Sequence, residues 1–478
     1  MTRPALLLAL ALVACGARTD LEVRPAGLDG GLARDAGVDA GVGPDGGTDG
    51  GTDGGTDGGF DGGFDGGFDG GFDAGPMCRP FRGRAVLATL DVFVVLDSSG
   101  SMASRTAAGT TKAAAVAAAL EGFVRAPASA GIGVALTFFP EVDRDVPLTC
   151  VNDAACGAAG MCDRPGLCQP DGRTWCRVAS DCRRPIDRCA PIGFCSGRPD
   201  QICIPGFAVG CSAGSTCVEG GLCRNRTRCA ADDYAPAVAL ATLPGAAEPF
   251  VSALRARLTE GGTPTAPALD GTLRRARARR ATNPESKVIV LFATDGFPTE
   301  CDPSFDPYAG SMPGAGIPLV VELASGGAAS GIETYVIGVF ERSEEADALV
   351  NLSAIARAGG TGEALVISTE EDVTARLLAI FDELRRTVRS CVYAIPHAGV
   401  LPEPDRLEVR LVSPGAPPIE VARRADPSLC DPVTGGFFFE PDVAMGARPG
   451  YVELCPASCA IASRPEVNIE MQADCDAP

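Results

Sequence analysis

Residues 92–101 read VFVVLDSSGS, an apolar run followed by an acidic residue and three serines around a glycine. The apolar run predicts a buried β-strand, and Asp97 lies where that strand passes into a loop. The oxygens of Asp97, Ser99 and Ser101 are the kind of ligand that hard divalent cations take. By itself the motif is more typical of a helix N-cap, because Asp and Ser are favoured there.

Two later segments offer further oxygen ligands. Residues 261–265 read GGTPT and precede a stretch predicted to be helical. Residues 287–296 read KVIVLFATDG, a second predicted buried strand that ends in a carboxylate. In an open parallel sheet the carboxyl ends of the strands share one edge, and ligands bind in the crevice there. We therefore expect one ion to be surrounded by Asp97, Ser99, Ser101, Thr263 and Asp295.

This three-part pattern resembles the von Willebrand factor type A (vWA) domain and its metal-ion-dependent adhesion site. In that family the first Asp, both Ser, a Thr and a second Asp surround the metal, and each has a matching residue here. Family members usually place the Thr directly after paired glycines, which favours Thr263 over Thr265. The resemblance implies an α/β, Rossmann-like domain over residues 88–140 and 230–389, with a mostly parallel sheet and helices on both faces.

The resemblance also implies a cofactor and a class of partner. The cofactor would be one divalent cation, with Mg²⁺ expected first and Mn²⁺ or Ca²⁺ as alternatives. One coordination position would stay open for an Asp or Glu carboxylate of a protein partner. In the family the last helix shifts when the site is occupied, and here that helix is expected at residues 370–388.

The N-terminus has the pattern of a targeting segment. Residues 5–14 are apolar but too short to span a bilayer. Residues 12–15 read LVAC, which resembles the bacterial lipobox. We therefore expect residues 1–15 to be a lipoprotein signal peptide and Cys15 to carry the lipid, with an ordinary cleaved signal as the alternative. Gly16, not Asp, follows the cysteine, which favours the outer membrane over the inner one.

Residues 16–77 are predicted to form a disordered Gly/Asp-rich tether. From residue 45 to 73 the chain repeats Asp-Gly-Gly-Thr and then Asp-Gly-Gly-Phe. Such a segment cannot bury enough apolar surface to fold. A calcium-binding repeat is the alternative, although glycine-Asp calcium solenoids have a period of nine residues, not four.

Composition excludes several function classes. The 478-residue chain has a net charge of −20, and its Lys and Arg residues form no basic stripe, so we expect no nucleic-acid partner. It contains a single His, which disfavours imidazole-based zinc sites and Ser-His or Cys-His nucleophiles. Ser99 and Ser101 also lack the G-x-S-x-G elbow of many hydrolases. We expect no enzymatic activity; metal-assisted hydrolysis is the alternative.

Twenty-one cysteines in an exported chain imply disulfides. Residues 141–229 contain thirteen of them, in a repeat whose period is 26 to 28 residues for most corresponding cysteines and that closes each time with Gly-Leu-Cys or Gly-Phe-Cys. We expect an insert of small disulfide-stapled modules, with pairing inside each four-cysteine unit. Zinc is disfavoured because the region has neither C-x-x-C pairs nor His. The units are Cys150, Cys156, Cys162 and Cys168; Cys176, Cys182, Cys189 and Cys195; and Cys203, Cys211, Cys217 and Cys223.

Residues 390–478 change to a period of two with frequent Pro and Gly, which predicts a small disulfide-stapled β-rich domain. Its five cysteines are an odd number, and Cys78 is a natural sixth partner. Cys229 and Cys301 would then be left to pair with each other, in loops expected at the metal edge. The five are Cys391, Cys430, Cys455, Cys459 and Cys475.

The insert begins at the carboxyl end of a predicted strand, residues 132–139. That end of the strand is expected on the same edge of the sheet as Asp97. We therefore expect it on the rim of the metal face. The favoured function is a membrane-anchored, surface- or periplasm-facing protein that mediates metal-dependent protein binding or adhesion. In the alternative, the insert binds without metal or serves the envelope structurally, and the vWA domain is a scaffold.

Overall fold

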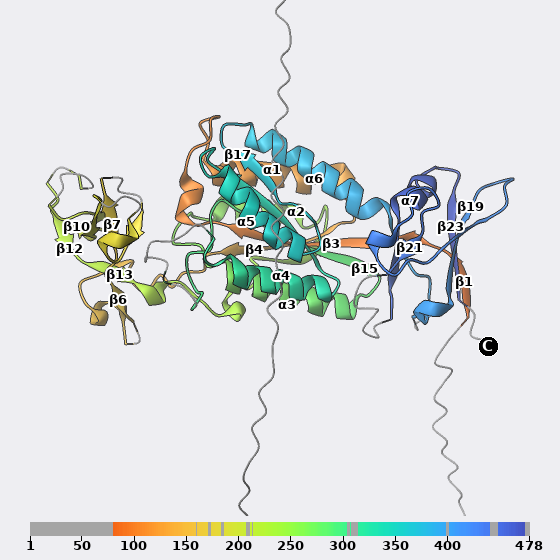
Figure 1. Ribbon diagram of the computed structural model, residues 1–478, viewed down its shortest axis with the longest axis horizontal. Helices are drawn as coiled ribbons and strands as arrows, with labels where there is room; N and C mark the ends of the chain where they lie inside the picture. The colour runs from red at the N-terminus through yellow and green to blue at the C-terminus, as the bar shows by residue number, and fades with distance from the viewer. Residues whose placement is uncertain are drawn as a thin grey trace, which may run out of the picture. The chain divides into compact units, whose positions relative to one another are not determined.

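The computed structural model describes residues 80–473, except 159, 171–173, 183–185, 207–210, 213, 304–305, 307–313, 398–400 and 440–447 (Figure 1). The predicted signal peptide, Cys15, the predicted tether, Cys78 and Cys475 lie outside the described residues. Among the described helices, none is both long and apolar enough to cross a membrane.

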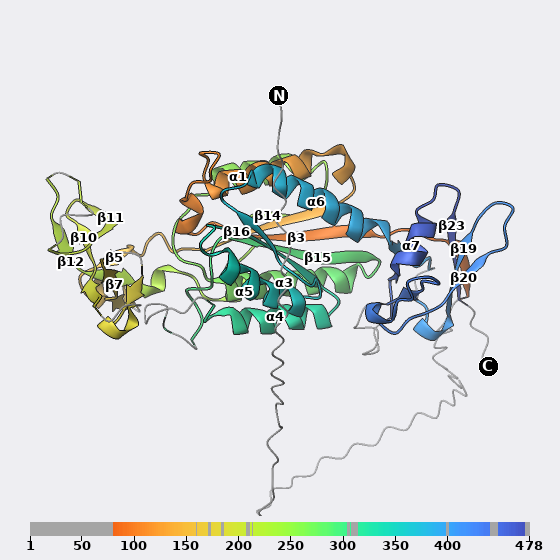
Figure 2. The same cartoon turned by 45° about the horizontal axis from the view of Figure 1, so that its top comes forward.

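A six-stranded sheet lies at the centre of the main domain (Figure 2). Its strand order is β14-β4-β3-β15-β16-β17. All neighbouring pairs are parallel except β14 with β4, so β14 is an antiparallel edge strand. The strands are β3 (Thr89–Asp97), β4 (Gly133–Phe139), β14 (Val238–Thr242), β15 (Ser286–Thr294), β16 (Glu333–Phe340) and β17 (Leu365–Ser368).

Both faces of the sheet are covered by helices. Along β3, Val92, Val94 and Leu96 pack in one core with α1, α2 and α6, whereas Phe93 and Val95 pack in a second core with α3, α4 and α5. This double burial explains the unbroken apolar run, which is typical of parallel sheets. The predicted fold class is confirmed. The helices are α1 (Lys112–Arg125), α2 (Ala247–Ala256), α3 (Thr265–Thr282), α4 (Ile317–Ala329), α5 (Glu345–Ala358) and α6 (Val373–Ser390).

The C-terminal region forms two further four-stranded sheets, ordered β1-β23-β19-β20 and β2-β18-β22-β21. The helix α7 (Pro456–Ala462) also lies there, and Cys391–Cys459 and Cys430–Cys455 are bonded. The strands are β1 (Phe81–Arg84), β2 (Val86–Leu87), β18 (Val392–Ala394), β19 (Leu407–Val412), β20 (Ile419–Val421), β21 (Phe437–Phe438), β22 (Tyr451–Leu454) and β23 (Asn468–Ala473).

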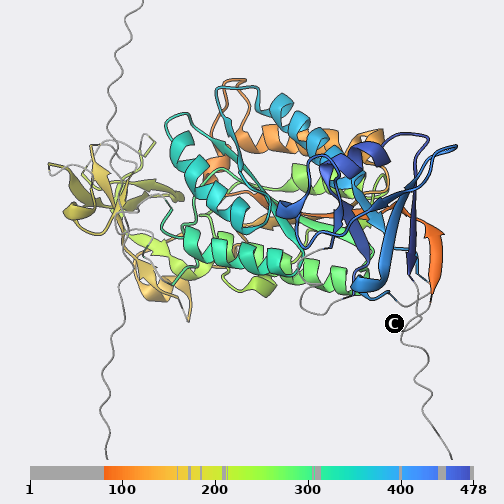
Figure 3. The ribbon, with the colours of Figure 1, turned by 45° about the vertical axis from the view of Figure 1, so that its right-hand side comes forward.

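The predicted boundary of this region at residue 390 leaves out two strands. Although β1 and β2 precede the central sheet in sequence, β1 pairs with β23 and β2 with β18. Figure 3 shows the orange strand from the beginning of the described chain beside the blue C-terminal strands. Both are short edge strands, and their partners follow about 390 residues later for β1 and about 310 for β2, so local sequence pattern does not reveal the pairing. Residues 81–87 therefore belong structurally with the C-terminal sheets.

The cysteine-rich insert consists of three small modules, each a three-stranded antiparallel sheet around a central strand. The central strands are β7 (Gly166–Gln169), β10 (Gly193–Cys195) and β13 (Gly221–Cys223). They begin with the repeated glycine because a Cβ there would lie 2.2 to 2.6 Å from a carbonyl oxygen of a flanking strand. The flanking strands are β5 (Thr149–Cys150), β6 (Cys162–Asp163), β8 (Trp175–Cys176), β9 (Arg188–Pro191), β11 (Arg198–Cys203) and β12 (Cys217–Glu219).

The expected pairing of cysteines inside each unit is wrong for half of the six bonds in these modules. In two modules the Gly-Leu-Cys or Gly-Phe-Cys segment comes first instead of last, as strands β7 and β10. In the third module it comes last, as β13, but pairs with strands from the beginning of the insert. The sequence period is the same for either phase. Three bonds cross the expected boundaries: Cys156–Cys223, Cys168–Cys182 and Cys195–Cys211. Three stay within them: Cys150–Cys162, Cys176–Cys189 and Cys203–Cys217.

One module joins the two ends of the insert. Its central strand β13 comes from the end of the insert, whereas β5 and β6 come from the beginning. The bond Cys156–Cys223 spans 67 residues and makes this closure covalent. The two segments that connect the insert to the main domain, residues 141–142 and 227–228, form a stem. They are joined by a β-bridge between Val142 and Thr227 and by a hydrogen bond from the Arg228 N–H to the Glu141 carbonyl. The insert therefore leaves and rejoins the main domain at one place.

We expect the double variant Cys156→Ser/Cys223→Ser to loosen the whole insert. In the loop-entropy view, a bond across 67 residues contributes roughly 4 kcal/mol, against roughly 3 kcal/mol for a loop of 14. Limited trypsin digestion should cut the variant near the stem faster than a control, Cys203→Ser/Cys217→Ser, that opens one module internally. Equal cleavage near the stem in both variants would contradict the closing role.

Candidate functional site

The carboxyl ends of β3 and β15 bring the expected site residues together. The Asp97 carboxylate accepts a hydrogen bond from the Ser99 N–H at 2.7 Å. The Ser99 and Ser101 hydroxyls are 3.0 Å apart, and Ser101 donates to Asp295 Oδ1 at 2.7 Å. These side chains do not cap a helix, because the 3-10 turn that follows Ser99 has no side-chain cap hydrogen bond.

Thr263 reaches the same place through the glycine loop. A methyl group built on Gly296 would lie 3.5 Å from Thr263 Oγ1 and 3.8 Å from Ser101 Oγ, so both hydroxyls face one spot beside Asp295. Gly261 has a φ of 76°, and its carbonyl accepts from the Gly100 N–H at 3.0 Å. The paired glycines thus let the Thr263 loop lie directly against the Asp97 loop.

The two carboxylates share a buried and electrostatically unfavourable position. Asp97 is 1% exposed and Asp295 is 3% exposed. Burial and then the charge of Asp295 raise the pKa of Asp97 to about 7, and hydrogen bonds from Ser99 and Thr294 only partly oppose this. Burial also raises the pKa of Asp295, against the effect of Lys112. Folding therefore concentrates negative charge here at a cost that a cation would relieve.

Lys112 is a further residue at this candidate site, and its place there is not evident from the sequence. Its Nζ lies 3.0 Å from Asp295 Oδ2, and its side chain is 3% exposed. Lys112 is the first residue of α1, so the start of that helix aims a cation at the carboxyl edge of the sheet. The only signal in the sequence is one Lys at the head of an Ala-rich helix. Asp97, by contrast, is held by the neutral Ser99 N–H and the Thr294 hydroxyl at 2.6 Å.

The donor set fits a hard divalent cation. It consists of two carboxylates and three hydroxyls, all oxygens, with one carboxylate already paired to an ammonium group. Mg²⁺ takes one or two carboxylates and keeps several waters, so it suits this set better than a soft metal would. The cysteine groups close enough to hold a metal, within the described residues, are all joined in disulfides and offer no thiolates.

A cavity of about 690 Å³ opens over the hydroxyl side of this site. Ser99, Ser101 and Thr263 line one end of it. The other wall comes from the insert and includes Trp175, Ile202, Leu222, Arg224 and Arg226. The insert therefore stands on the rim of the face that carries Asp97 and Asp295, as the strand directions predict.

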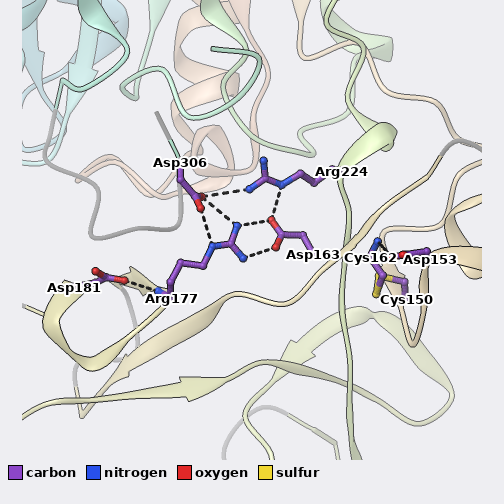
Figure 4. Close-up of polar contacts among 8 residues, drawn as sticks. All are labelled: Cys150, Asp153, Cys162, Asp163, Arg177, Asp181, Arg224 and Asp306. Carbon is purple, nitrogen blue, oxygen red and sulfur yellow. Dashed lines mark hydrogen bonds and ion pairs between the residues drawn. A yellow bond between two sulfur atoms is a disulfide. The ribbon is translucent and has the colours of Figure 1, made fainter. Parts of the chain in front are cut away.

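A charge network fastens the insert to the loop after β15 (Figure 4). Arg177 binds both oxygens of Asp163 and donates from Nε to Asp306 at 2.8 Å. Arg224 also contacts both acids, at 2.5 Å and 3.3 Å. Burial alone would raise the pKa of Asp163, but the hydrogen bonds from the two arginines hold it below its usual value. The four side chains thus join two modules of the insert to the main domain.

Further contacts join the foot of the insert to both loops of the site. Arg226 binds Glu260 at 2.7 Å, directly before the paired glycines, and Thr227 donates to Glu300 at 2.8 Å. Glu300 in turn fills the space beside Gly262, where a Cβ would lie 2.6 Å from the Glu300 carboxyl carbon. Cys229 and Cys301, the pair left over in the sequence analysis, form a disulfide between the end of the insert and the loop after Asp295.

No protein-family model matches the chain, and no curated protein sequence matches it. Solved structures similar to it include the pilus adhesin SpaC from Lactobacillus rhamnosus GG, at 13% identity over 81% of this chain and 39% of SpaC, with a TM-score of 0.33. A von Willebrand factor type A protein from Catenulispora acidiphila has 12% identity over 82% of this chain and 59% of its own, with a TM-score of 0.31. The pilus adhesin RrgA from Streptococcus pneumoniae has 9% identity over 82% and 58%, with a TM-score of 0.30. The chain thus spans less than two thirds of each, and its fold class rests on its own strand order and register.

We expect the stability of the protein in EDTA to fall between pH 4 and pH 7. Asp97 has a pKa of about 7 when folded, against 3.8 ordinarily. In this window the folded state keeps a proton that the unfolded state has lost, so the free energy of unfolding decreases as pH rises. The loss should be smaller in Asp97→Asn, where only the raised pKa of Asp295 contributes at this site, and reversed in the wild type by Mg²⁺, as measured by thermal unfolding. Parallel pH profiles of the wild type and Asp97→Asn in EDTA would contradict this.

We expect Lys112→Met to destabilise the protein in EDTA and to increase its response to Mg²⁺. The substitution leaves the Asp295 carboxylate buried and unpaired, which costs about 3 to 5 kcal/mol. It also removes the cation that competes with Mg²⁺ for that carboxylate. Lys287→Met is the matched control, because Lys287 is another buried Lys but contacts Glu333 and Glu453 instead. A gain in Mg²⁺ stabilisation equal to that of the control would show that Lys112 has no part in the site.

Proposed function

We propose that this protein is an exported, lipid-anchored binding protein that captures a carboxylate of a protein partner through a divalent cation. Asp97, Ser99, Ser101, Thr263 and Asp295 would hold the cation, directly or through water, and Mg²⁺ is the cation that this donor set favours. When bound, the cation supplies the positive charge that attracts the partner's Asp or Glu.

The observation that carries this proposal is the pair of buried carboxylates beside three hydroxyl residues that line a cavity, of which Ser101 is exposed. Asp97 and Asp295 are shielded from water, whereas Ser101 is exposed and lies between Ser99 and Asp295. The negative charge is therefore held below the surface, and neutral hydroxyls face the cavity. A partner carboxylate that enters the cavity meets these hydroxyls first, so it approaches without direct contact with the two acids.

The remaining residues of the site hold the loops in position. The Ser98 hydroxyl donates to the Phe139 carbonyl at 2.8 Å, and Arg257 donates to Ser98 Oγ at 2.8 Å. Arg257 also binds Glu141 and the Pro140 carbonyl, where the chain enters the insert. These contacts fix the Asp97 loop before any ligand arrives, which lowers the ordering cost of binding.

Export is supported by the disulfides, nine of which lie among the described residues. Disulfides at this density form and persist in oxidising compartments. The lipobox-like residues 12–15 and the Gly/Asp-rich segment that follows support attachment to the outer membrane on a tether.

A second candidate function gives the binding role to the insert alone, with the main domain as scaffold. The observation in its favour is the apolar insert wall of the cavity, with Trp175, Ile202 and Leu222. In this case binding would not depend on metal, so metal removal separates the two functions.

Two peptide arrays test the proposed function directly. One array holds peptides of varied sequence centred on Asp, and the other holds the same peptides centred on Asn. We expect the purified protein to be retained by members of the Asp array in Mg²⁺, but not in EDTA and not on the Asn array. Asp97→Asn should abolish retention, whereas Asp91→Asn, at the opposite end of β3 and paired with Arg279, should not. Retention that is equal on both arrays and insensitive to EDTA would refute metal-dependent capture and favour the insert alone.

A further inference from the structure

We infer that the cavity selects a partner segment in which a single acidic residue stands next to large apolar residues. This inference rests on the proposed function, because the acidic residue is the one that the cation would bind. It goes further in assigning the second part of the ligand to the insert.

The two ends of the cavity differ in chemistry. At one end the lining is made of the hydroxyl-bearing residues Ser99, Ser101 and Thr263. At the other end Trp175, Ile202 and Leu222 come from three different modules of the insert. Ligand pockets commonly combine a few polar groups that set orientation with apolar side chains that supply contact area. A ligand that satisfies both ends must therefore carry a carboxylate and an apolar group close together.

The size of the cavity argues against a lone carboxylate as the ligand. A volume of about 690 Å³ corresponds to on the order of twenty waters at about 30 Å³ each. One Asp or Glu side chain would displace only a few of these. The waters against Trp175, Ile202 and Leu222 would stay, and displacing them with apolar atoms is what adds affinity.

The charges around the cavity argue against a polyacidic ligand. The guanidinium groups of Arg224 and Arg226 are already bonded to Asp163, Asp306 and Glu260. Two acidic residues, Glu300 and Asp302, also line the cavity. A second carboxylate next to the first would therefore find both of these guanidinium groups already paired, whereas an apolar neighbour needs no such partner. This separates the expected partner segment from an acidic polysaccharide.

The insert wall is held in place before any ligand binds. The Asp163–Arg177–Asp306–Arg224 network attaches it to the loop that follows Asp295 (Figure 4). The Cys229–Cys301 disulfide attaches it to the same loop. The covalent closure at Cys156–Cys223 keeps the module of Leu222 together. A wall fixed in this way gives the cavity a constant shape, so it can discriminate between neighbours of the acidic residue.

The chain contains a single Trp, and Trp175 is part of this wall, so its fluorescence reports occupancy of the insert end. The test titrates the purified protein in Mg²⁺ with four blocked peptides whose central residues are Leu-Asp-Leu, Gly-Asp-Gly, Leu-Asn-Leu and Glu-Asp-Glu. We expect Leu-Asp-Leu to bind at least tenfold more tightly than the other three and to change the Trp175 emission, and EDTA to abolish this binding.

Two matched variants locate the apolar contact. Ile202→Ala should weaken binding of the Leu-Asp-Leu peptide several-fold and leave the Gly-Asp-Gly peptide unaffected. Ile186→Ala makes the same change at an insert position that is 81% exposed and outside the cavity lining, and it should have no effect.

The outcomes separate this inference from the proposed function. Equal, Mg²⁺-dependent binding of Leu-Asp-Leu and Gly-Asp-Gly would overturn the inference and leave the proposed function standing. Equal binding of Leu-Asp-Leu and Leu-Asn-Leu that persists in EDTA would overturn the proposed function. Failure of the Leu-Asp-Leu peptide to bind at millimolar concentration in Mg²⁺ would overturn the inference, and the peptide arrays would then decide on the proposed function by themselves.

Discussion

The repulsion between two buried carboxylates, Asp97 and Asp295, is the constraint around which this molecule is arranged. Because β3 and β15 are parallel neighbours, their last residues meet at one edge of the sheet, with little water to screen them. Lys112 neutralises one of the two charges, so the site has a net charge of about −1 once Asp97 is also ionised, above its pKa of about 7. A divalent cation would bring it to about +1 and leave an attraction for one further carboxylate. Without Lys112 the loaded site would be neutral, so in the proposed function this residue would weaken the hold on the metal and strengthen the attraction for the partner.

The closure of the insert explains how residues 141–229 can interrupt the domain without disturbing its sheet. An insertion is tolerated when its ends are close together, and here the stem and the β13 module join the ends by hydrogen bonds and by Cys156–Cys223. The antiparallel pair β4 and β14 can therefore form as if a short turn connected them. Because β4 is parallel to β3, that turn lies at the Asp97 edge, and strand direction alone places the insert wall beside the site.

The parts of this site that could be predicted are those encoded by local pattern. Apolar runs ending in Asp97 and Asp295 give two parallel strands, and paired glycines before Thr263 give a loop that can lie against them. Lys112 could not be predicted in the same way, because its role depends on how α1 is placed over β15. The boundaries between the modules of the insert could not be predicted either, because a repeat has the same period wherever its boundaries are drawn. Side-chain partners such as Arg177 and Asp306 are separated by 129 residues, and neither lies in a local pattern that identifies the other.

The last helix of the main domain connects the site region to the C-terminal sheets. Along one side α6 packs on α1, which carries Lys112, with the Phe123 and Phe381 rings 5.5 Å apart. At its end Cys391 is bonded to Cys459 in α7, and β18 follows at once. The resemblance to vWA domains implies a shift of this helix when the site is occupied. In this chain such a shift would have to move a disulfide-linked sheet with it or stop at Cys391, so the C-terminal region would limit how far the shift could be transmitted along α6.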